Sequence, residues 1–217
     1  MWAILPIEGK ELPSIWYRLL YSYVKLSRIT KIVHYNRILQ LATLLSPLNK
    51  VVDVGAGYGI VADLIHQGVR TLYLVEKDLE ILSKSTNKMK KLENVEKILA
   101  EATNLPFISE SMDLVYFHDS LNEMSNKISA LREAARIVKR GGCLAVFDWD
   151  KKRLMTKIKE ILLNKAGFPV NCSNMDEIVC IIGRMGLKII LAQSNIDGSM
   201  TILAQKTKEN LLMGMVT

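Results

Sequence analysis

The sequence predicts an α/β fold with a doubly wound, seven-stranded, mostly parallel sheet and an antiparallel last strand. Three observations lead to this prediction. Short β-branched runs alternate with helical periodicity from residue 50 onward, the first run leads into a glycine turn, and a hairpin signal separates the last two runs. Strands that alternate with helices form parallel sheets covered on both faces. A terminal hairpin then gives a last strand that runs against the others.

Seven runs have the length and composition of strands. They are rich in β-branched side chains and are bounded by turn residues. The predicted strands span residues 50–54, 71–75, 95–100, 113–117, 143–147, 188–193 and 200–205. Asp197-Gly198 lies between the last two runs, and this dipeptide is a strong hairpin signal.

Apolar residues at helical spacing fill the intervals between these strands. The predicted helices span residues 60–65, 79–92, 128–138 and 173–185. The third helix should end within the segment 139–142, because basic residues would lie in its last turn and two glycines would follow it. Ser173 and Asp176 have the spacing of a helix cap, so we expect them to start the fourth.

Residues 13–45 also show helical spacing, which the segment 46–49 breaks. We therefore predict an N-terminal helical cap over residues 1–46 and a main α/β domain over residues 47–217. A further segment, residues 151–165, has one amphipathic face, and we expect this face to pack on the core rather than on a membrane. Its apolar residues are Leu154, Ile158, Ile161 and Leu162.

Composition excludes several classes of protein. The chain has 217 residues, of which 49% are hydrophobic and 24% charged, as in an ordinary globular protein. No apolar run is long enough for a membrane span, and charged residues come too early for a signal peptide. The three cysteines form no C-x-x-C pair, so we expect a reducing, cytoplasmic location and no metal site.

The formal net charge of +7 is concentrated in two segments. Residues 1–46 hold six basic and two acidic side chains, and residues 151–165 hold six basic and one acidic. Solvated lysine-rich helix faces are the ordinary explanation for such segments. An anionic partner is the alternative.

A glycine turn joins the first predicted strand to its helix. Gly55, Gly57 and Gly59 alternate with other residues, whereas the dinucleotide fingerprint places its third glycine one position later. Glu76 ends the next strand, 21 residues after Gly55, where a carboxylate can accept both hydroxyls of an adenosine ribose. The spacing therefore favours an adenosine ligand that lacks a pyrophosphate.

With these motifs the chain resembles the class I S-adenosylmethionine-dependent methyltransferases, in particular the type 11 or ubiquinone/menaquinone-biosynthesis-like group. Five motifs carry the resemblance: residues 51–59 (VVDVGAGYG), Glu76, residues 101–107 (EATNLPF), residues 111–115 (SMDLV) and residues 131–142 (LREAARIVKRGG). The chain departs from the family pattern at two positions within these motifs. Glutamate replaces the usual aspartate at 101, and arginine replaces the usual proline at 140.

The resemblance implies a Rossmann-like methyltransferase fold and S-adenosylmethionine as the cofactor. It implies that the methionine end lies over the glycine turn with Asp53 beneath it, and that Glu76 holds the ribose. His118 is the candidate general base, with packing or cofactor contact as its alternative role, whereas His34 and His66 are expected to be structural. The implied cofactor-binding residues are Asp53, Gly55, Ala56, Gly57, Tyr58, Gly59, Glu76, Lys77, Glu101, Ala102, Thr103, Phe117 and His118.

A small molecule is our first expectation for the methyl acceptor. The end of the fourth strand lacks both the N/D-P-P-Y/F motif of adenine aminomethylation and the Pro-Cys pair of cytosine methylation. An RNA- or protein-directed methyltransferase that uses the basic segments remains the second reading. A non-catalytic binding protein that keeps the cofactor fold is the third, and a nicotinamide oxidoreductase is the least favoured. The oligomeric state, monomer or homodimer, stays open.

Overall fold

The structure is a computed structural model that describes residues 36, 39–40, 43–44, 47–57, 59, 61, 65–84, 92–165, 167 and 169–207. Most of the predicted N-terminal cap, residues 1–46, lies outside the described residues, as do His34 and Tyr58. The boundary predicted between cap and main domain therefore stays a prediction.

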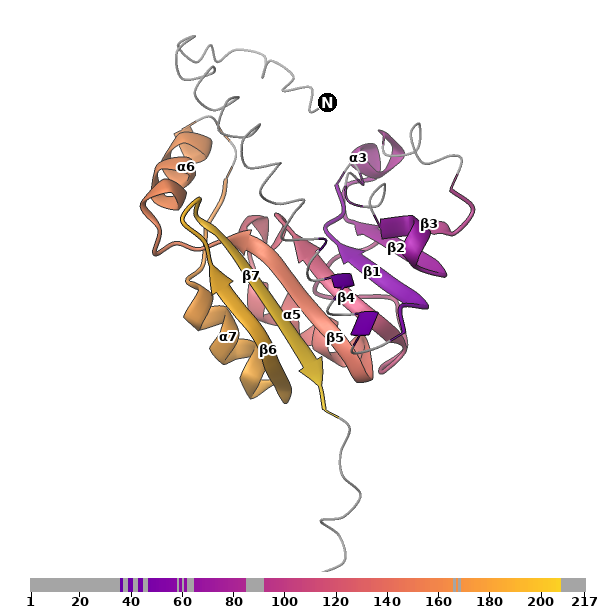
Figure 1. Cartoon of the computed structure of the whole chain (residues 1–217). Helices are drawn as coiled ribbons and strands as arrows, with labels where there is room; N and C mark the ends of the chain where they lie inside the picture. Colours follow the sequence, from indigo (N-terminus) through magenta and orange to yellow (C-terminus); the bar gives the residue numbers. More distant parts are fainter. Residues whose placement is uncertain are drawn as a thin grey trace, which may run out of the picture.

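One seven-stranded sheet organises the chain, with strand order β3-β2-β1-β4-β5-β7-β6 (Figure 1). Its strands are β1 (Lys50–Val54), β2 (Thr71–Glu76), β3 (Val95–Leu99), β4 (Met112–His118), β5 (Val138–Trp149), β6 (Leu187–Ser194) and β7 (Ser199–Lys206). The pairs from β3 to β5 are parallel, and β7 runs antiparallel to both of its neighbours. The predicted fold class is confirmed.

The winding direction reverses between β1 and β4, which are neighbours in the sheet but not in the sequence. In open parallel sheets, ligands bind outside the carboxyl ends of the strands at this reversal. The residues that follow β1, β2, β3 and β4 therefore meet at one edge of the molecule, and we call it the carboxyl edge.

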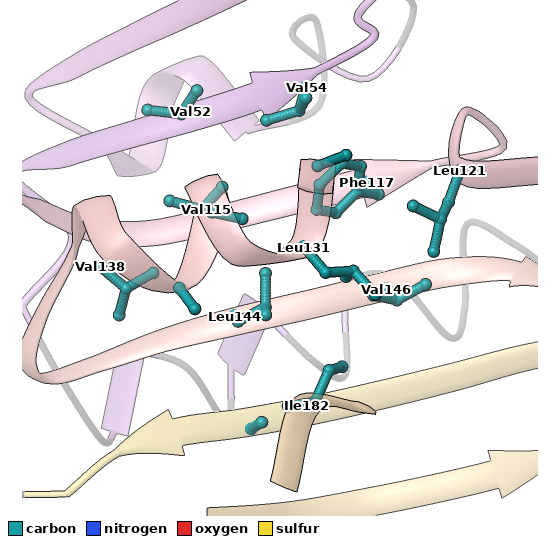
Figure 2. Packing of buried hydrophobic residues seen from close by; sticks show 14 of the residues in the cluster. Val52, Val54, Val115, Phe117, Leu121, Leu131, Val138, Leu144, Val146 and Ile182 are labelled. Atoms are coloured by element: carbon teal, nitrogen blue, oxygen red, sulfur yellow. The ribbon is translucent and has the colours of Figure 1, made fainter. Parts of the chain in front are cut away.

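Two hydrophobic clusters cover the two faces of the sheet. Alternate residues of β1 belong to different clusters, because successive strand side chains point to opposite faces. One cluster contains helix α5 (Lys127–Ile137) and helix α7 (Met175–Arg184), and Figure 2 shows Leu131 and Ile182 among the strand side chains. The other cluster contains Val61 and Ile65, the two described residues of the helix predicted over 60–65.

The remaining elements are short or lie at the carboxyl edge. They are the helices α3 (Leu79–Lys84) and α6 (Leu154–Lys165) and the 3-10 turns η1 (His66–Gly68) and η2 (Leu121–Glu123). Among the described residues, no helix has the length and apolar character needed to cross a membrane.

Two local predictions were wrong. The segment 139–142 belongs to β5 rather than to the end of a helix, because α5 stops at Ile137 and Val138 already pairs with Met112. Asn174, not Ser173, precedes α7 as its N-cap residue. The Ser173 hydroxyl instead accepts a hydrogen bond from Lys127 Nζ at 2.9 Å, and Asp176 forms an ion pair with Lys152.

The expected packing of α6 was also wrong. Leu154 is 71% exposed and Ile161 is 55% exposed, so this face does not join either described core cluster. The opposite side of the helix packs inward through Thr156, which is fully buried and donates to Gly198 O at 3.0 Å. The helix is thus held by a polar contact to the β6–β7 hairpin.

Gly142 lies where β4 and β5 approach unusually closely. A Cβ atom there would sit 2.9 Å from Asp113 O and 3.0 Å from both Met112 O and Lys139 O. The β4–β5 register shifts at this point, between Met112 and Leu114. The glycine at position 142 therefore allows the backbones of β4 and β5 to approach each other here.

We predict opposite stability effects for two glycine replacements. Gly142→Ala should destabilise the protein by about 1–3 kcal/mol, because the new methyl group meets backbone oxygens that cannot retreat. Gly183→Ala should stabilise it by up to about 1 kcal/mol, because the position is helical and no described atom lies within 4 Å of the new Cβ. Urea unfolding measures both changes, and a neutral Gly142→Ala would contradict the close approach.

Candidate functional site

The glycine turn after β1 is fastened to the end of β2. The N–H groups of Gly55 and Ala56 both donate to Val75 O, at 2.9 and 3.0 Å. Gly55 has a φ of 73°, and a Cβ atom there would lie 2.6 Å from Ser120 Cβ. Ser120 Oγ also donates to Val54 O at 2.7 Å. Gly55 is therefore required by the contact between this turn and the segment after β4.

Gly57 lies on the open side of the same turn. Its φ is 55°, which glycine adopts without strain. No described heavy atom lies within 4 Å of the position that a Cβ would occupy. A ligand can therefore approach the backbone of Gly57 from this side.

Glu76, at the end of β2, holds the glycine turn through its side chain. Its Oε2 accepts the Gly57 N–H at 3.0 Å, and its Oε1 accepts those of Lys77 at 2.9 Å and Asp78 at 3.1 Å. A carboxylate has about four acceptor positions, so one remains on Oε2. The Glu76 side chain is 8% exposed, and its free acceptor position allows it to bind the turn and a ligand together.

The loop after β3 runs beside Glu76. Ala100 N–H donates to Glu76 O at 3.1 Å, which places the following residues at the same edge of the sheet. Glu101 and Thr103 are exposed there, and Ala102 is half-buried. Lys77 is exposed on the neighbouring loop. The structure thus brings the predicted adenosine-binding residues together.

Asp53 lies near the end of β1, two residues before Gly55. Its side chain is 2% exposed, and its Oδ1 has no hydrogen-bond partner within the described residues. Burial raises the pKa of Asp53 to about 7, against a lowering effect from Tyr116 and with a smaller raising effect from Glu76. A buried carboxylate oxygen with no partner is costly unless a ligand supplies one.

The two predicted site residues at the end of β4, Phe117 and His118, differ in the burial of their side chains. His118 is half-buried, with its ring centroid 6.2 Å from that of Phe147. The Phe117 ring is fully buried in the core cluster (Figure 2), so only its backbone can face the site. His66 lies on η1, where Asn94 Nδ2 donates to its carbonyl oxygen at 2.6 Å, in agreement with a structural role.

Sequence reasoning missed a group of polar side chains at the ends of β4 and β5. Asp119 has a φ of 53°, and its Oδ1 accepts the Trp149 indole N–H at 2.7 Å. Asp148 Oδ2 accepts the Asn122 N–H at 3.0 Å, which fixes η2 to β5. Burial and the charge of Asp119 raise the pKa of Asp148 to about 7. The only signal in the sequence was the Asp-Trp-Asp run at residues 148–150.

Most cations of residues 151–165 are engaged within the protein. Lys159 Nζ lies 3.4 Å from the centre of the Trp149 ring, and Arg153 donates to Ser194 Oγ and Ser194 O at 2.8 Å. Lys152 pairs with Asp176, and Lys151 Nζ lies 3.7 Å from Glu160 Oε1. These contacts support the interpretation of the segment as a structural helix face.

A polar cavity of about 480 Å³ opens beside η2, near the start of α5 and α7. Lys127, Lys151 and Asn171 are among its lining residues. Lys127 Nζ donates to Ser173 Oγ and to Asn171 O, so the cavity is crossed by internal hydrogen bonds. In the part of the chain that the structure describes, no three metal-ligating side chains cluster together.

Comparison with known proteins agrees with this geometry. Residues 52–146 match the model of a methyltransferase domain family, Methyltransf_11. The chain is 31% identical over 135 residues to the demethylmenaquinone methyltransferase of Thermotoga maritima, covering 58% of this chain and 56% of that protein. It is 30% identical over 107 residues to the ubiquinone/menaquinone biosynthesis C-methyltransferase UbiE of Campylobacter jejuni, covering 48% and 46%. The chain thus spans about half the length of the curated relatives it matches.

Solved structures show the same fold. The YcgJ protein of Bacillus subtilis superimposes with a TM-score of 0.67 at 17% identity, over 81% of this chain and 100% of that one. The fold is the Rossmann-like α/β fold of the class I S-adenosylmethionine-dependent methyltransferases. Through residues 52–146 the chain is similar to the methyltransferase domains of the Methyltransf_11 family. This similarity agrees with the predicted resemblance and with S-adenosylmethionine as the predicted cofactor.

The residues present fit this cofactor. The open side of Gly57 leaves room for a ligand against the backbone. Glu76 Oε2 keeps an acceptor position for a ribose hydroxyl, and Asp53 Oδ1 lacks a partner among the described residues. Ribose hydroxyls donate hydrogen bonds, and the methionine end carries an ammonium group, so each matches the chemistry that the site offers.

We predict that Glu76→Gln weakens the binding of S-adenosylhomocysteine at least about tenfold, because hydrogen bonds to a charged acceptor are worth about 1.5–3 kcal/mol. In either amide orientation, an NH₂ group faces the N–H of Gly57 or those of Lys77 and Asp78. Calorimetry measures the affinity, and Glu96→Gln on the exposed side of β3 is the matched control. Equal affinities of the two variants would contradict the role of Glu76.

Proposed function

We propose that the protein transfers the methyl group of S-adenosylmethionine to a small-molecule acceptor at the carboxyl edge of β4 and β5. The observation that carries the proposal is the glycine turn clamped by Glu76, which leaves Gly57 open and lies against Ser120 of the segment after β4. A cofactor on this turn places its methionine end next to the residues that follow β4. The cytoplasmic location expected from the cysteine pattern stays part of this proposal.

We assign the adenosine end to the residues that follow β2 and β3. Glu76 would accept from the ribose, with Lys77, Glu101, Ala102 and Thr103 around it. The methionine end would lie over residues 55–59, with Asp53 below. The half-burial of Ala102 and the exposure of its neighbours leave this edge accessible.

The cofactor supplies an electrophilic methyl group on a sulfonium, so the protein mainly provides approach geometry and exclusion of water. A general base is needed where the acceptor loses a proton. His118 ends β4 and is half-buried, which suits a side chain that accepts a proton from an acceptor beside the glycine turn. Asp119 and Trp149 fix the backbone that follows it.

A hydroquinone-type aromatic ring is our first candidate for the acceptor. The relatives named above include a demethylmenaquinone methyltransferase. Large apolar side chains are exposed at the same end of the molecule, where α6 meets the β6–β7 hairpin, and they could shield an apolar molecule from water. They include Leu154, Met155, Ile158, Ile161 and Ile196.

RNA and protein acceptors remain the alternative reading, together with a binding protein without turnover. The internal contacts of Lys151, Lys152, Arg153 and Lys159 leave fewer cations for phosphate groups. Lys157 and Lys165 are exposed on α6 and are the best remaining candidates for an RNA contact.

We predict that His118→Gln lowers kcat by about 10²-fold or more, the range for loss of a general base, while the affinity for S-adenosylhomocysteine changes little. Turnover is measured with a hydroquinone acceptor, and calorimetry gives the affinity. His66→Gln is the control, because His66 lies on η1, away from the carboxyl edge. A variant that loses affinity but keeps kcat would make His118 a cofactor contact instead.

We expect Lys157→Gln combined with Lys165→Gln to leave binding to total RNA unchanged and weak. Filter binding at two salt concentrations tests this, with the Arg184→Gln and Lys188→Gln double variant as the control of equal charge. If RNA is the acceptor, the log–log salt slope should instead fall by about 0.7 for each lost phosphate contact. That result would favour the RNA-directed alternative.

A further inference from the structure

Two charged side chains of α5, Glu133 and Arg136, lie against the loop of residues 100–107 that follows β3, which we call the β3 loop. The two residues are three positions apart, a spacing that makes them neighbours on a helix surface. Arg136 Nε lies 2.7 Å from Glu133 Oε1, and Arg136 Nη2 donates to Glu133 Oε2 at 2.8 Å. They therefore form a two-point ion pair, which we call the α5 ion pair.

The α5 ion pair satisfies the backbone of the β3 loop at Leu105. The Leu105 N–H donates to Glu133 Oε2 at 2.9 Å, and Leu105 O accepts from Arg136 Nη2 at 3.0 Å. Arg136 Nη1 donates further along the loop, to Phe107 O at 2.8 Å. The Leu105 side chain is 2% exposed, and backbone groups in buried positions need such partners. One ion pair thus holds the loop at three backbone atoms.

Other contacts fix the two ends of the β3 loop. At its start, the Ala100 N–H donates to Glu76 O at 3.1 Å. At its end, the Phe107 ring packs edge-on against Tyr73 of β2, with ring centroids 5.1 Å apart. Residues 101–103, which we assign to the adenosine end of the cofactor, lie between these ends. The α5 ion pair is therefore the polar attachment of the loop on the side away from Glu76.

The geometry depends on the shape of the arginine side chain. Its planar guanidinium directs separate N–H groups at Glu133, at Leu105 O and at Phe107 O, whereas a lysine ammonium is a single point charge. The hydrogen bond from Arg136 lowers the pKa of Glu133, so the pair stays charged at neutral pH. A pair that only stabilised α5 would need no contact with the loop.

We propose that Glu133 and Arg136 are positioning residues for the cofactor, because they hold the β3 loop in the conformation that receives the adenine. The inference rests on the proposed placement of the adenosine end beside the residues that follow β2 and β3. Both side chains act through the loop backbone. Affinity scales with the fraction of protein in the binding-competent conformation, so a loop that is held in advance binds adenine more tightly.

Three ligands isolate the contribution of the adenine. S-Adenosylhomocysteine and 5′-deoxy-5′-methylthioadenosine both contain it, whereas S-ribosylhomocysteine keeps the ribose and the amino acid end but has no adenine. Calorimetry measures all three, with the last at high concentration. A variant with a misplaced β3 loop should bind the two adenine ligands more weakly by the same factor. Its affinity for S-ribosylhomocysteine should not change.

Arg136→Lys is the first variant, because it keeps the charge but cannot reach both Leu105 O and Phe107 O. We expect about tenfold weaker binding of the two adenine ligands, since hydrogen bonds from a charged group are lost from the loop. Arg132→Lys is the matched control, because Arg132 is exposed on the same helix one turn earlier. It should leave the affinities for all three ligands unchanged.

Glu133→Gln tests the other half of the α5 ion pair. In either amide orientation an NH₂ group faces a donor, either Arg136 Nε or the Leu105 N–H. The variant should therefore lose affinity for the same two ligands. Because both side chains act on one loop, the double variant should lose less affinity than the product of the two single losses. Two independent losses that multiply would contradict joint action.

A measurement on the unaltered protein makes the test independent of how the variants fold. If the α5 ion pair holds the loop before the cofactor arrives, the Leu105 N–H should exchange slowly with deuterium in the ligand-free protein. Binding of S-adenosylhomocysteine should then slow this exchange little further. Rapid exchange in the ligand-free protein would mean that the loop is not held in advance, and would overturn the inference.

The outcomes separate the inference from the function on which it rests. If neither adenine ligand binds the unaltered protein, the proposed cofactor placement is wrong. If both bind it and bind Arg136→Lys equally well, the proposed function stands and the inference is overturned. The inference is also overturned if Arg136→Lys loses affinity for S-ribosylhomocysteine to the same extent, because the change would then not be confined to the adenine.

Discussion

The Glu76 carboxylate is the constraint on which the arrangement of the site depends. It joins the backbone of the glycine turn to the loop that begins after β2, through three N–H groups. Two backbone hydrogen bonds to Val75 O already fasten the start of the turn, and Glu76 extends this attachment to Gly57. Hydrogen bonds to charged acceptors are about twice as strong as neutral ones, which suits a clamp at an exposed edge. The same group that shapes the turn is thus available to the ligand.

A second set of carboxylates organises the other half of the carboxyl edge. Asp148 fixes η2, whereas Asp150 accepts from Ser194 Oγ at 2.6 Å and from the Lys152 N–H at 3.1 Å. Trp149 lies between them, donates to Asp119 and receives Lys159 over its ring. One tripeptide at the end of β5 therefore connects β4, α6 and the β6–β7 hairpin. The part of the carboxyl edge beside which an acceptor would lie, at the ends of β4 and β5, thus depends on these polar contacts more than on apolar packing.

The parallel sheet was predictable because its signals are local. Each strand is a short β-branched run with turn residues on both sides, and the glycine spacing together with Glu76 marked the cofactor edge. The wrong or missing predictions concern features that depend on contacts between residues far apart in the sequence. Ser173 has the sequence of a helix cap, but Lys127 lies close enough to take its hydroxyl. The β5 extension to Val138 depends on pairing with Met112, and the role of Asp148 depends on the position of Asn122. The exposure of the apolar face of α6 likewise depends on how the helix docks, which spacing does not encode.

The contact between Gly55 and Ser120 limits how this protein can change during evolution. The cofactor turn and the loop after β4 touch without room for another atom, since a Cβ at residue 55 would overlap the Ser120 side chain. A larger residue at position 55 would require a smaller one at position 120, and residue 55 is already a glycine without a side chain. Divergence toward new acceptors is therefore restricted on this side of the site. Substitutions are better tolerated on α6 and at the tip of the β6–β7 hairpin. Leu154 and Ile196 are largely exposed there, and replacing them does not move the glycine turn.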